Sequence, residues 1–445
     1  MPTVELREHC GSRGAGARPV PPPPRPGRRG LLLALLLASC ASPPFAQAPE
    51  RPNLVLIIGD DLGYTDYGFM GSPRVRTPHL DRLAREGTVF PVGYSTASVC
   101  RPALFSLLTG LEPLQAASRI EAIRGPWAPF VFLRSFPTLP RALADNGYAS
   151  FQAGKYWEAG PELAGFSAGM GDISQAHRLV RETTEPVYEF IDAHRAKPFF
   201  LWFAPLLPHL PHDAPREYLD LYGGEGLGAD EHVYYAAISW LDDAVGDLVS
   251  FLDSRGLRER TLIVYLADNG WQVEGFNREG RFWDGPRGKY TLYEIGFRTP
   301  VIFRWPGHVP AGQTNESLVS FPDVVTTLLG FGGARPDPGV GGIDLRRALA
   351  SGRRSPRDAL IGTMPEVRLD PPGTGRGLGP GGAFLRDRRW RYVLYDDGSE
   401  ELYDIERDPQ ESRNLAAEHG DLCADFRARI DGWRAQMKAA PAPGA

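Results

Sequence analysis

The sequence contains few cysteines and no apolar run long enough to cross a membrane. Only four of its 445 residues are cysteines, at positions 10, 40, 100 and 423. The first lies in a segment that export would remove, so the spacing indicates no disulfide framework. The clearest apolar run, residues 31–38, is far shorter than the roughly 20 residues that a transmembrane helix needs.

The sequence also has no excess of positive charge. Its 49 basic and 54 acidic residues give a formal net charge of −5, which offers no sign of a nucleic-acid partner. With 42% hydrophobic and 23% charged residues, the composition is that of an ordinary globular protein. The length is sufficient for one large α/β domain and a smaller one.

The N-terminal segment predicts export. Residues 1–30 are rich in arginine and proline, and the short apolar run and small residues follow, as in a secretory signal. Residues 37–40 match the bacterial lipobox, in which Cys40 would become the lipidated first residue; cleavage after Ala48 is the alternative. We predict a signal and lipobox over 1–40, a tether over 41–50, and a periplasmic or outer-envelope lipoprotein, otherwise a secreted protein. Membrane contact would then occur only through the lipid.

Two adjacent carboxylates follow the first predicted strand. Residues 53–58 are continuously apolar after Asn53, as in a buried parallel strand, and Asp60 and Asp61 come directly after it with a glycine on either side of the motif. The carboxyl ends of such strands are where α/β sheets bind ligands. We therefore favour metal binding over the alternative, in which the pair only caps the next segment.

Residues 98–110 form the most informative stretch. Pro102 suits the first turn of a helix and Gly110 its end, so Cys100 would lie beside free N–H groups and the positive end of a helix dipole. That position suits an anion. A small buried thiol is the alternative interpretation of Cys100.

This stretch resembles the signature of the type I sulfatases, Cys-x-Pro-x-Arg followed by a helix that ends Leu-Thr-Gly. Residues 52–61 also match the family opening and residues 401–409 its closing motif, so the resemblance extends from about residue 51 to 438. In that family the cysteine is oxidised to formylglycine, whose hydrate attacks the sulfate ester. The resemblance thus implies that a formylglycine-generating enzyme modifies Cys100.

The resemblance also implies the remaining site residues. Lys155 matches the lysine that contacts sulfate and formylglycine, His209 the histidine that binds sulfate, and Lys289 the lysine at the leaving oxygen. With Cys100 they form the implied catalytic set, which supplies donors where negative charge develops. The implied metal ligands are Asp60, Asp61, Cys100 in its modified form, Asp268 and Asn269. Oxygen ligands suit one hard cation such as Ca²⁺.

Two positions depart from the family. Leu104 replaces the signature arginine and Trp157 replaces a histidine. We expect Leu104 to pack against Trp157, and Arg101, on roughly the same helical face, to restore some of the charge. Because losing one preorganised donor often costs roughly 10²–10³-fold in rate, the predicted activity is weak hydrolysis of sulfate esters, on a small molecule or a glycan. A phosphoester or phosphonate hydrolase of the alkaline-phosphatase superfamily, and a binding protein without turnover, remain alternatives.

The implied fold is α/β and alkaline-phosphatase-like. A large mixed, mostly parallel sheet sandwiched by helices would form the catalytic domain, residues 51–365, and a small antiparallel sheet plus a helix the C-terminal subdomain, residues 366–445. The sequence places a helix over 234–252, with Asp242 and Asp243 expected on its polar face. It also predicts a charged, glycine-containing loop over 272–288 and a linker or exposed loop over 365–382. His79 and His212 are not expected to be ligands.

Overall fold

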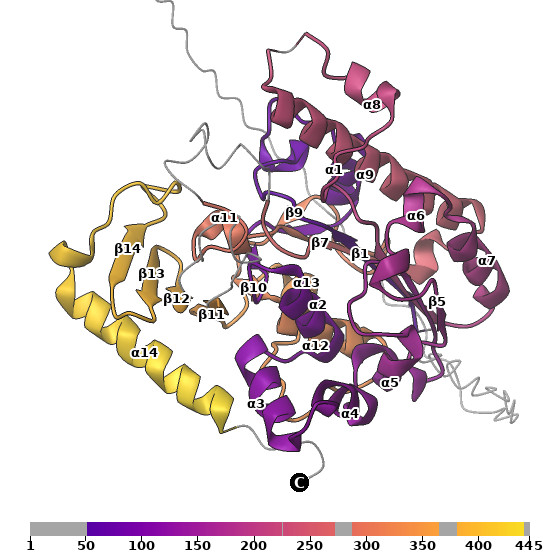
Figure 1. Ribbon diagram of the computed structural model, residues 1–445. Coiled ribbons are helices and arrows are strands. Elements are labelled where there is room, and N and C mark those ends of the chain that lie inside the picture. The colour runs from indigo at the N-terminus through magenta and orange to yellow at the C-terminus, as the bar shows by residue number, and fades with distance from the viewer. Residues whose placement is uncertain (1–50, 225, 272–286, 365–380, 440–445) are drawn as a thin grey trace, which may run out of the picture. The chain divides into compact units, whose positions relative to one another are not determined.

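The three most apolar predicted strands lie together at the centre of one sheet (Figure 1). The computed structural model describes residues 51–224, 226–271, 287–364 and 381–439. Strand β1 (Asn53–Gly59) pairs in parallel with β6 (Phe199–Ala204) on one side and with β7 (Thr261–Ala267) on the other. All three strands are buried along their full length, as their continuous apolar sequences predict.

Eight strands make up this sheet, in the order β5-β4-β6-β1-β7-β8-β2-β9. The other five are β2 (Thr88–Phe90), β4 (Ala149–Gly154), β5 (Ala168–Gly169), β8 (Val301–Arg304) and β9 (Gln313–Thr314). Only the β7–β8 and β8–β2 pairs are antiparallel. The prediction of a mixed, mostly parallel sheet is therefore confirmed.

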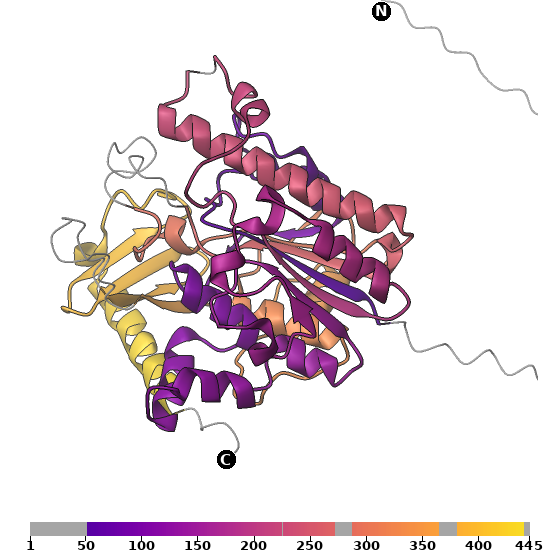
Figure 2. The same cartoon turned by 45° about the vertical axis from the view of Figure 1, so that its right-hand side comes forward.

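Helices cover both faces of the sheet, because successive side chains of its strands point to opposite sides. On β1, Val55 and Ile57 belong to one hydrophobic cluster, whereas Leu54, Leu56 and Ile58 belong to another. The first cluster contains residues of α1 (Pro78–Glu86), α7 (Glu185–His194) and α9 (Ala229–Ser254). The second contains residues of α2 (Cys100–Thr109), α5 (Leu139–Ala144) and α12 (Phe321–Phe331). Figure 2 shows these two layers above and below the sheet.

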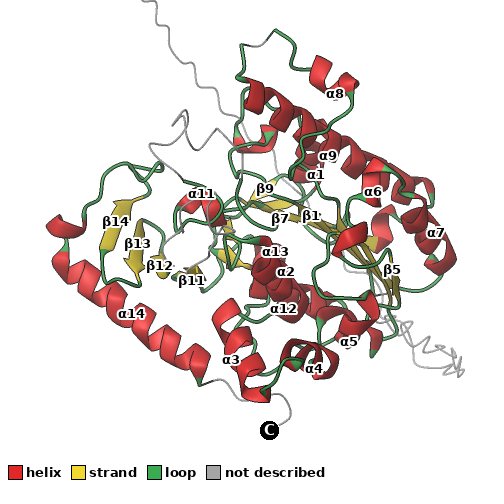
Figure 3. Ribbon diagram, in the orientation of Figure 1, coloured by secondary structure: helices red, strands yellow, loops and turns green. Residues whose placement is uncertain are grey.

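A second, antiparallel sheet has the order β11-β12-β13-β14 and carries the long helix α14 (Gly420–Lys438) on one face (Figure 3). Its strands are β11 (Leu360–Met364), β12 (Gly382–Arg386), β13 (Trp390–Tyr395) and β14 (Glu400–Asp404). Phe426 and Ile430 of the helix pack on Leu385 and Tyr392 of the strands. This confirms the predicted sheet and helix and adds β11, which the sequence did not indicate.

The remaining elements connect these parts. They are β3 (Gly93–Tyr94), β10 (Val319–Ser320), α3 (Pro113–Ile123), α4 (Ala128–Ser135), α6 (Arg178–Arg181), α8 (Arg216–Asp220), α11 (Glu294–Phe297) and α13 (Arg346–Ser351). Strands β3 and β10 pair with each other in parallel.

Several predictions lie outside the described residues. These are the signal and lipobox with Cys40, the tether over 41–50, and most of the loops predicted over 272–288 and 365–382. Among the residues that are described, none of the helices is both long and apolar enough to cross a membrane. The division into domains at residue 365 stays a prediction.

Candidate active site

The ends of β1 and β7 bring four predicted ligands together. The two strands are in register, with Gly59 opposite Ala267, so the residues that follow each strand are neighbours. Asp268 donates its backbone N–H to Gly59 O at 2.9 Å, and Asp61 donates its own to Asp268 Oδ1 at 3.2 Å. Asp61 has a φ of +63°, a left-handed conformation that is uncommon outside glycine.

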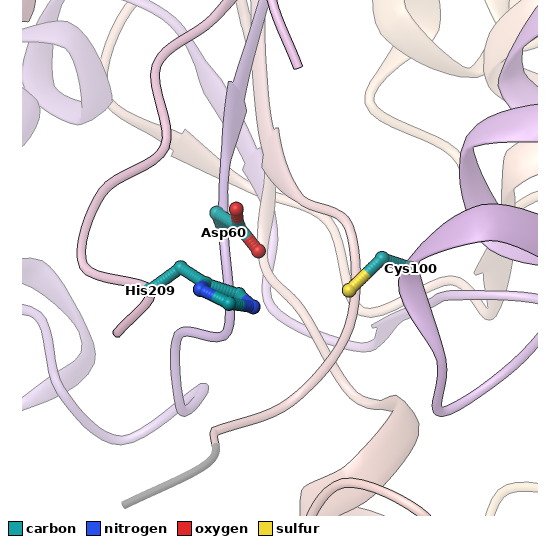
Figure 4. Close-up of side chains that lie close together, drawn as sticks. All are labelled: Asp60, Cys100 and His209. Carbon is teal, nitrogen blue, oxygen red and sulfur yellow. The ribbon is translucent and has the colours of Figure 1, made fainter. Parts of the chain in front are cut away.

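Cys100 occupies the first position of α2, as predicted, and Gly110 ends that helix in a left-handed conformation. The side chain is buried, with Sγ 3.8 Å from Asp61 Oδ1. Figure 4 shows it pointing toward Asp60 and toward His209, which lies in the loop after β6. Burial raises the pKa of the Cys100 thiol far above its usual value, so the unmodified side chain is a neutral thiol and a poor ligand.

Two lysines form ion pairs with the three carboxylates. Lys155 Nζ bonds to Asp60 Oδ1 and to Asp268 Oδ2, the latter at 3.1 Å. Lys289 Nζ lies 2.7 Å from Asp61 Oδ1 and 2.9 Å from Asp61 Oδ2. Both lysines are buried, although exposure is the usual state of a lysine. Neither lysine is therefore a solvated surface charge, and their catalytic roles stay a prediction.

The pKa values of Asp60 and Asp61 shift in opposite directions. Burial raises the pKa of Asp60 to about 6, and the ammonium group of Lys155 offsets only part of that effect. Burial also disfavours the charge of Asp61, but the nearby Lys289 and His209 outweigh it and hold its pKa at about 2. His209 Nε2 is 3.5 Å from Asp61 Oδ2, while Nδ1 donates to Leu210 O at 2.6 Å.

The residues fit one divalent cation. Four side chains each place one possible ligand atom within 4.8 Å of the others: those of Asp60, Asp61, Cys100 and Asp268. Asp60 Oδ2 and Asn269 Oδ1 are buried and have no hydrogen-bond partner among the described residues. A buried oxygen without a partner is costly. A hard cation would satisfy both oxygens.

Known proteins resemble this chain over most of its length. The family model of the sulfatases matches residues 52–334. The chain belongs to the sulfatase family. The resemblance of the motifs and the predicted class of enzyme, a sulfuric ester hydrolase, are thereby confirmed.

Individual relatives support the assignment over most of the chain. Mouse (Mus musculus) N-acetylgalactosamine-6-sulfatase is 31% identical over 377 residues, which cover 73% of this sulfatase and 71% of the relative. Human (Homo sapiens) arylsulfatase A is 30% identical over 387 residues, 75% and 73% of the two chains. The crystal structure of Ps i-CgsB superposes with a TM-score of 0.71 at 24% identity, over 89% of this chain and 94% of that one. The last comparison supports the alkaline-phosphatase-like fold.

The two departures of this sulfatase from the family signature lie in different surroundings. Leu104 is buried in the hydrophobic cluster between the sheet and α12. Trp157 is 37% exposed and, among the described residues, lies outside that cluster, so the expected packing of the two is not seen. Arg101 was expected to restore some of the missing charge. Its guanidinium instead forms a two-bond ion pair with Glu158, at 2.8 and 3.0 Å. Glu158 was not singled out from the sequence, where its only signal is its distance of three residues from Lys155.

Asp242 was wrongly expected to be a polar-face residue of α9. It is buried, and its carboxylate accepts the backbone N–H groups of His79 at 2.9 Å and Leu80 at 2.7 Å. It therefore satisfies the free donors at the start of α1 from a distant helix, which spacing within α9 cannot reveal. Asp243 is exposed, and its Oδ1 lies 3.5 Å from Nε2 of His79.

Proposed function

We propose that this protein hydrolyses sulfate esters of glycans by means of a formylglycine formed from Cys100 and one bound Ca²⁺. The observation that carries the proposal is the position of Cys100: its Sγ faces the carboxylates at the ends of β1 and β7 from the N-terminus of α2. A group at this position receives the positive end of the helix dipole and the free N–H groups of its first turn. An oxyanion is stabilised there.

Asp60, Asp61, Asp268 and Asn269 would hold the cation, with the modified side chain of residue 100. The cation would supply electrostatic polarisation of the sulfate group. The formylglycine would supply the nucleophile, which the neutral, buried thiol of Cys100 is not suited to be.

The basic residues bind and orient the ester. Lys155 places its ammonium group at Asp60 and Asp268, and Lys289 places its own at Asp61. Charged donors at fixed positions need no reorganisation as negative charge builds on the sulfate oxygens. Lys289 is the group we assign to the leaving oxygen. His209 is 28% exposed at its side chain, so it can reach a substrate from the open side of the site.

The glycan substrate class is inferred from relatives. One is named an N-acetylgalactosamine-6-sulfatase, and Ps i-CgsB was solved in complex with k-i-k-neocarrahexaose. Both names refer to saccharides. We therefore expect saccharide sulfates to be hydrolysed in preference to simple aryl sulfates.

The test is production of the protein together with a formylglycine-generating enzyme, followed by mass spectrometry of the peptide that contains residue 100. Sulfate release from a panel of sulfated saccharides and an aryl sulfate is then measured, with the Cys100→Ala variant as the blank. Phosphate and phosphonate esters serve as competing substrates. Sulfate release that requires Cys100 supports the proposal. Formylglycine without turnover, or faster cleavage of phosphonate esters, would contradict it.

We further propose that the protein is exported and attached to a membrane through a lipid at Cys40. The support is the lipobox at residues 37–40, which follows a short apolar run. Export would place the enzyme where extracellular sulfated glycans are accessible.

A further inference from the structure

Tyr290 has an unfavourable backbone conformation beside the site. Its φ is +70°, a value that favours glycine and is rare for a bulky side chain. Hydrogen bonds hold this segment in place: Tyr290 N donates to Ser98 O at 3.1 Å and Lys289 N donates to Trp271 O at 3.0 Å. Such conformations persist where the surroundings enforce them, and they concentrate at functional sites.

The aromatic ring of Tyr290 lies beside Lys289 of the site. Lys289 Nζ lies 5.5 Å from the centre of the Tyr290 ring and 2.7 Å from Asp61 Oδ1. The ring and the Asp61 carboxylate therefore lie near the same ammonium group. Tyr290 is half-buried, so part of it stays open to a ligand. Burial raises the pKa of its phenol, despite the opposing charge of Lys289, and the hydroxyl is a donor at neutral pH.

The site needs such a donor. Leu104, one helical turn after Cys100, has no polar atom and is buried among apolar side chains. Arg101 is paired with Glu158. The ammonium groups of Lys155 and Lys289 are already bonded to carboxylates. An anion with several oxygens therefore finds fewer free donors here than the family signature provides.

We propose that Tyr290 contacts the substrate and that its hydroxyl donates a hydrogen bond to an oxygen of the sulfate group. This inference rests on the proposed function. It assigns to Tyr290 part of the role that an arginine at position 104 would have.

A purely structural role of Tyr290 predicts a different result for the Tyr290→Phe variant. The Tyr290 ring also packs against the hydrophobic cluster that includes Leu292 and Phe297. If packing were its only role, Tyr290→Phe would keep the ring and change nothing. Tyr293→Phe is the matched control, because it removes a hydroxyl from the same segment; that hydroxyl bonds to Glu401 at 3.4 Å, not to the site.

The experiment compares the calcium-loaded wild type, Tyr290→Phe and Tyr293→Phe. It measures kcat and KM for a sulfate ester, the dissociation constant of inorganic sulfate by calorimetry, and Tm. We expect Tyr290→Phe to lower kcat/KM about 10- to 100-fold, the loss typical of one hydrogen bond to a charged group. Sulfate affinity should fall about tenfold, with Tm nearly unchanged and Tyr293→Phe within about twofold of wild type.

Sulfate affinity and kcat/KM within twofold of wild type in Tyr290→Phe would overturn the inference, as would an equal loss in Tyr293→Phe. If the wild type hydrolyses no sulfate ester, the proposed function fails. The comparison of sulfate affinities still decides the role of Tyr290 in that case.

Discussion

Leu104 is the residue at which this chain differs most from the sulfatase signature. It is one turn after Cys100 on α2, and it is 4% exposed within an apolar cluster. An arginine here would carry a planar, permanently charged group on the helical face that Cys100 shares. It would also restore the charge-assisted bonds by which a maturation enzyme can bind this segment.

We predict that Leu104→Arg raises the fraction of formylglycine at residue 100 several-fold when the protein is made with a formylglycine-generating enzyme. Mass spectrometry of the peptide gives this fraction. Tm should fall by a few degrees, because a charge replaces a buried apolar side chain. Combining the change with Trp157→His is the fuller restoration, and Leu104→Met, which conserves volume, is the control. A wild type that already carries complete formylglycine would show that Leu104 does not limit maturation.

The sequence was sufficient to predict which of these residues lie together, because each predicted ligand directly follows a recognisable strand or begins a helix. Asp60, Asp268 and Cys100 are examples, and the structure brings them together. The sequence was not sufficient to predict contacts between residues that lie far apart in the chain. The Arg101–Glu158 pair and the direction of the Tyr290 ring depend on how loops from separate elements meet.

At the scale of elements, β1 and β7 act as one unit at the site. Their parallel register holds the two pairs of predicted ligands side by side, so a cation between them would crosslink the strand ends. Ligands that bind only the folded state stabilise it by mass action, by about 2.7 kcal/mol at a concentration of 100 Kd.

We predict that calcium raises the Tm of the wild type and that EDTA reverses the increase. Asn269→Ala removes one unpartnered oxygen, so it should weaken calcium binding at least about tenfold, as loss of even an outer-shell partner often does. Calorimetric titration with calcium is the measurement. Asn53→Ala is the control: Asn53 is buried at the other end of β1, where its side chain bonds to Thr261 and Phe199. Equal loss of calcium affinity in both variants would contradict a site at the strand ends.

Element prediction succeeded where a pattern is local and failed where it is not. Continuous apolar runs gave β1, β6 and β7, and helical spacing gave α9. Strand β11 was missed because its five residues only become a strand by pairing with β12, whose sequence is some 20 residues further on. The cap that Asp242 provides for α1 likewise depends on tertiary packing.

At the scale of the whole molecule, a buried ionic cluster joins the C-terminal part to the segment that carries Lys289. Arg391 of β13 pairs with Glu294 at 3.1 Å and with Glu411 at 3.1 Å. Glu411 Oε2 also accepts the backbone N–H of Glu294 at 2.8 Å. Burial raises the pKa of Glu411 to about 8, although Arg391 acts in the opposite direction.

We predict that this carboxyl makes stability fall as pH rises. A pKa raised from 4.5 to about 8 means that the folded state binds more protons between these values. The stabilisation is complete below pH 4.5 and is lost as pH rises through 8. Glu411→Gln, which keeps an acceptor for Glu294, should therefore gain Tm relative to wild type between pH 5 and pH 9, by about 1–3 °C. Parallel Tm curves for the two proteins would refute this.

Export is also a property of the whole molecule. We predict that Cys40→Ser shifts the protein from the membrane to the soluble fraction, because the lipid would be its only attachment. Fractionation followed by immunoblotting measures the shift, with Cys423→Ser as the control for loss of a thiol. Unchanged fractionation of Cys40→Ser would mean that the protein is not a lipoprotein.

The charges of the paired lysines and carboxylates couple the binding of the cation to the binding of the sulfate ester. Asp60, Asp61 and Asp268 contribute three negative charges and Lys155 and Lys289 two positive ones, so these groups together carry one negative charge. A divalent cation reverses that sign, and a sulfate monoester, with a single charge, then makes the assembly neutral. A phosphate monoester, with nearly two charges, does not. The coupling free energy between two bound ligands is the same in both directions, so the cation and the sulfate ester should raise each other's affinity by the same factor. Titration of the Cys100→Ala variant with an aryl sulfate, with and without calcium, measures that factor; a value of one would mean that the charges of the site do not select its ligands.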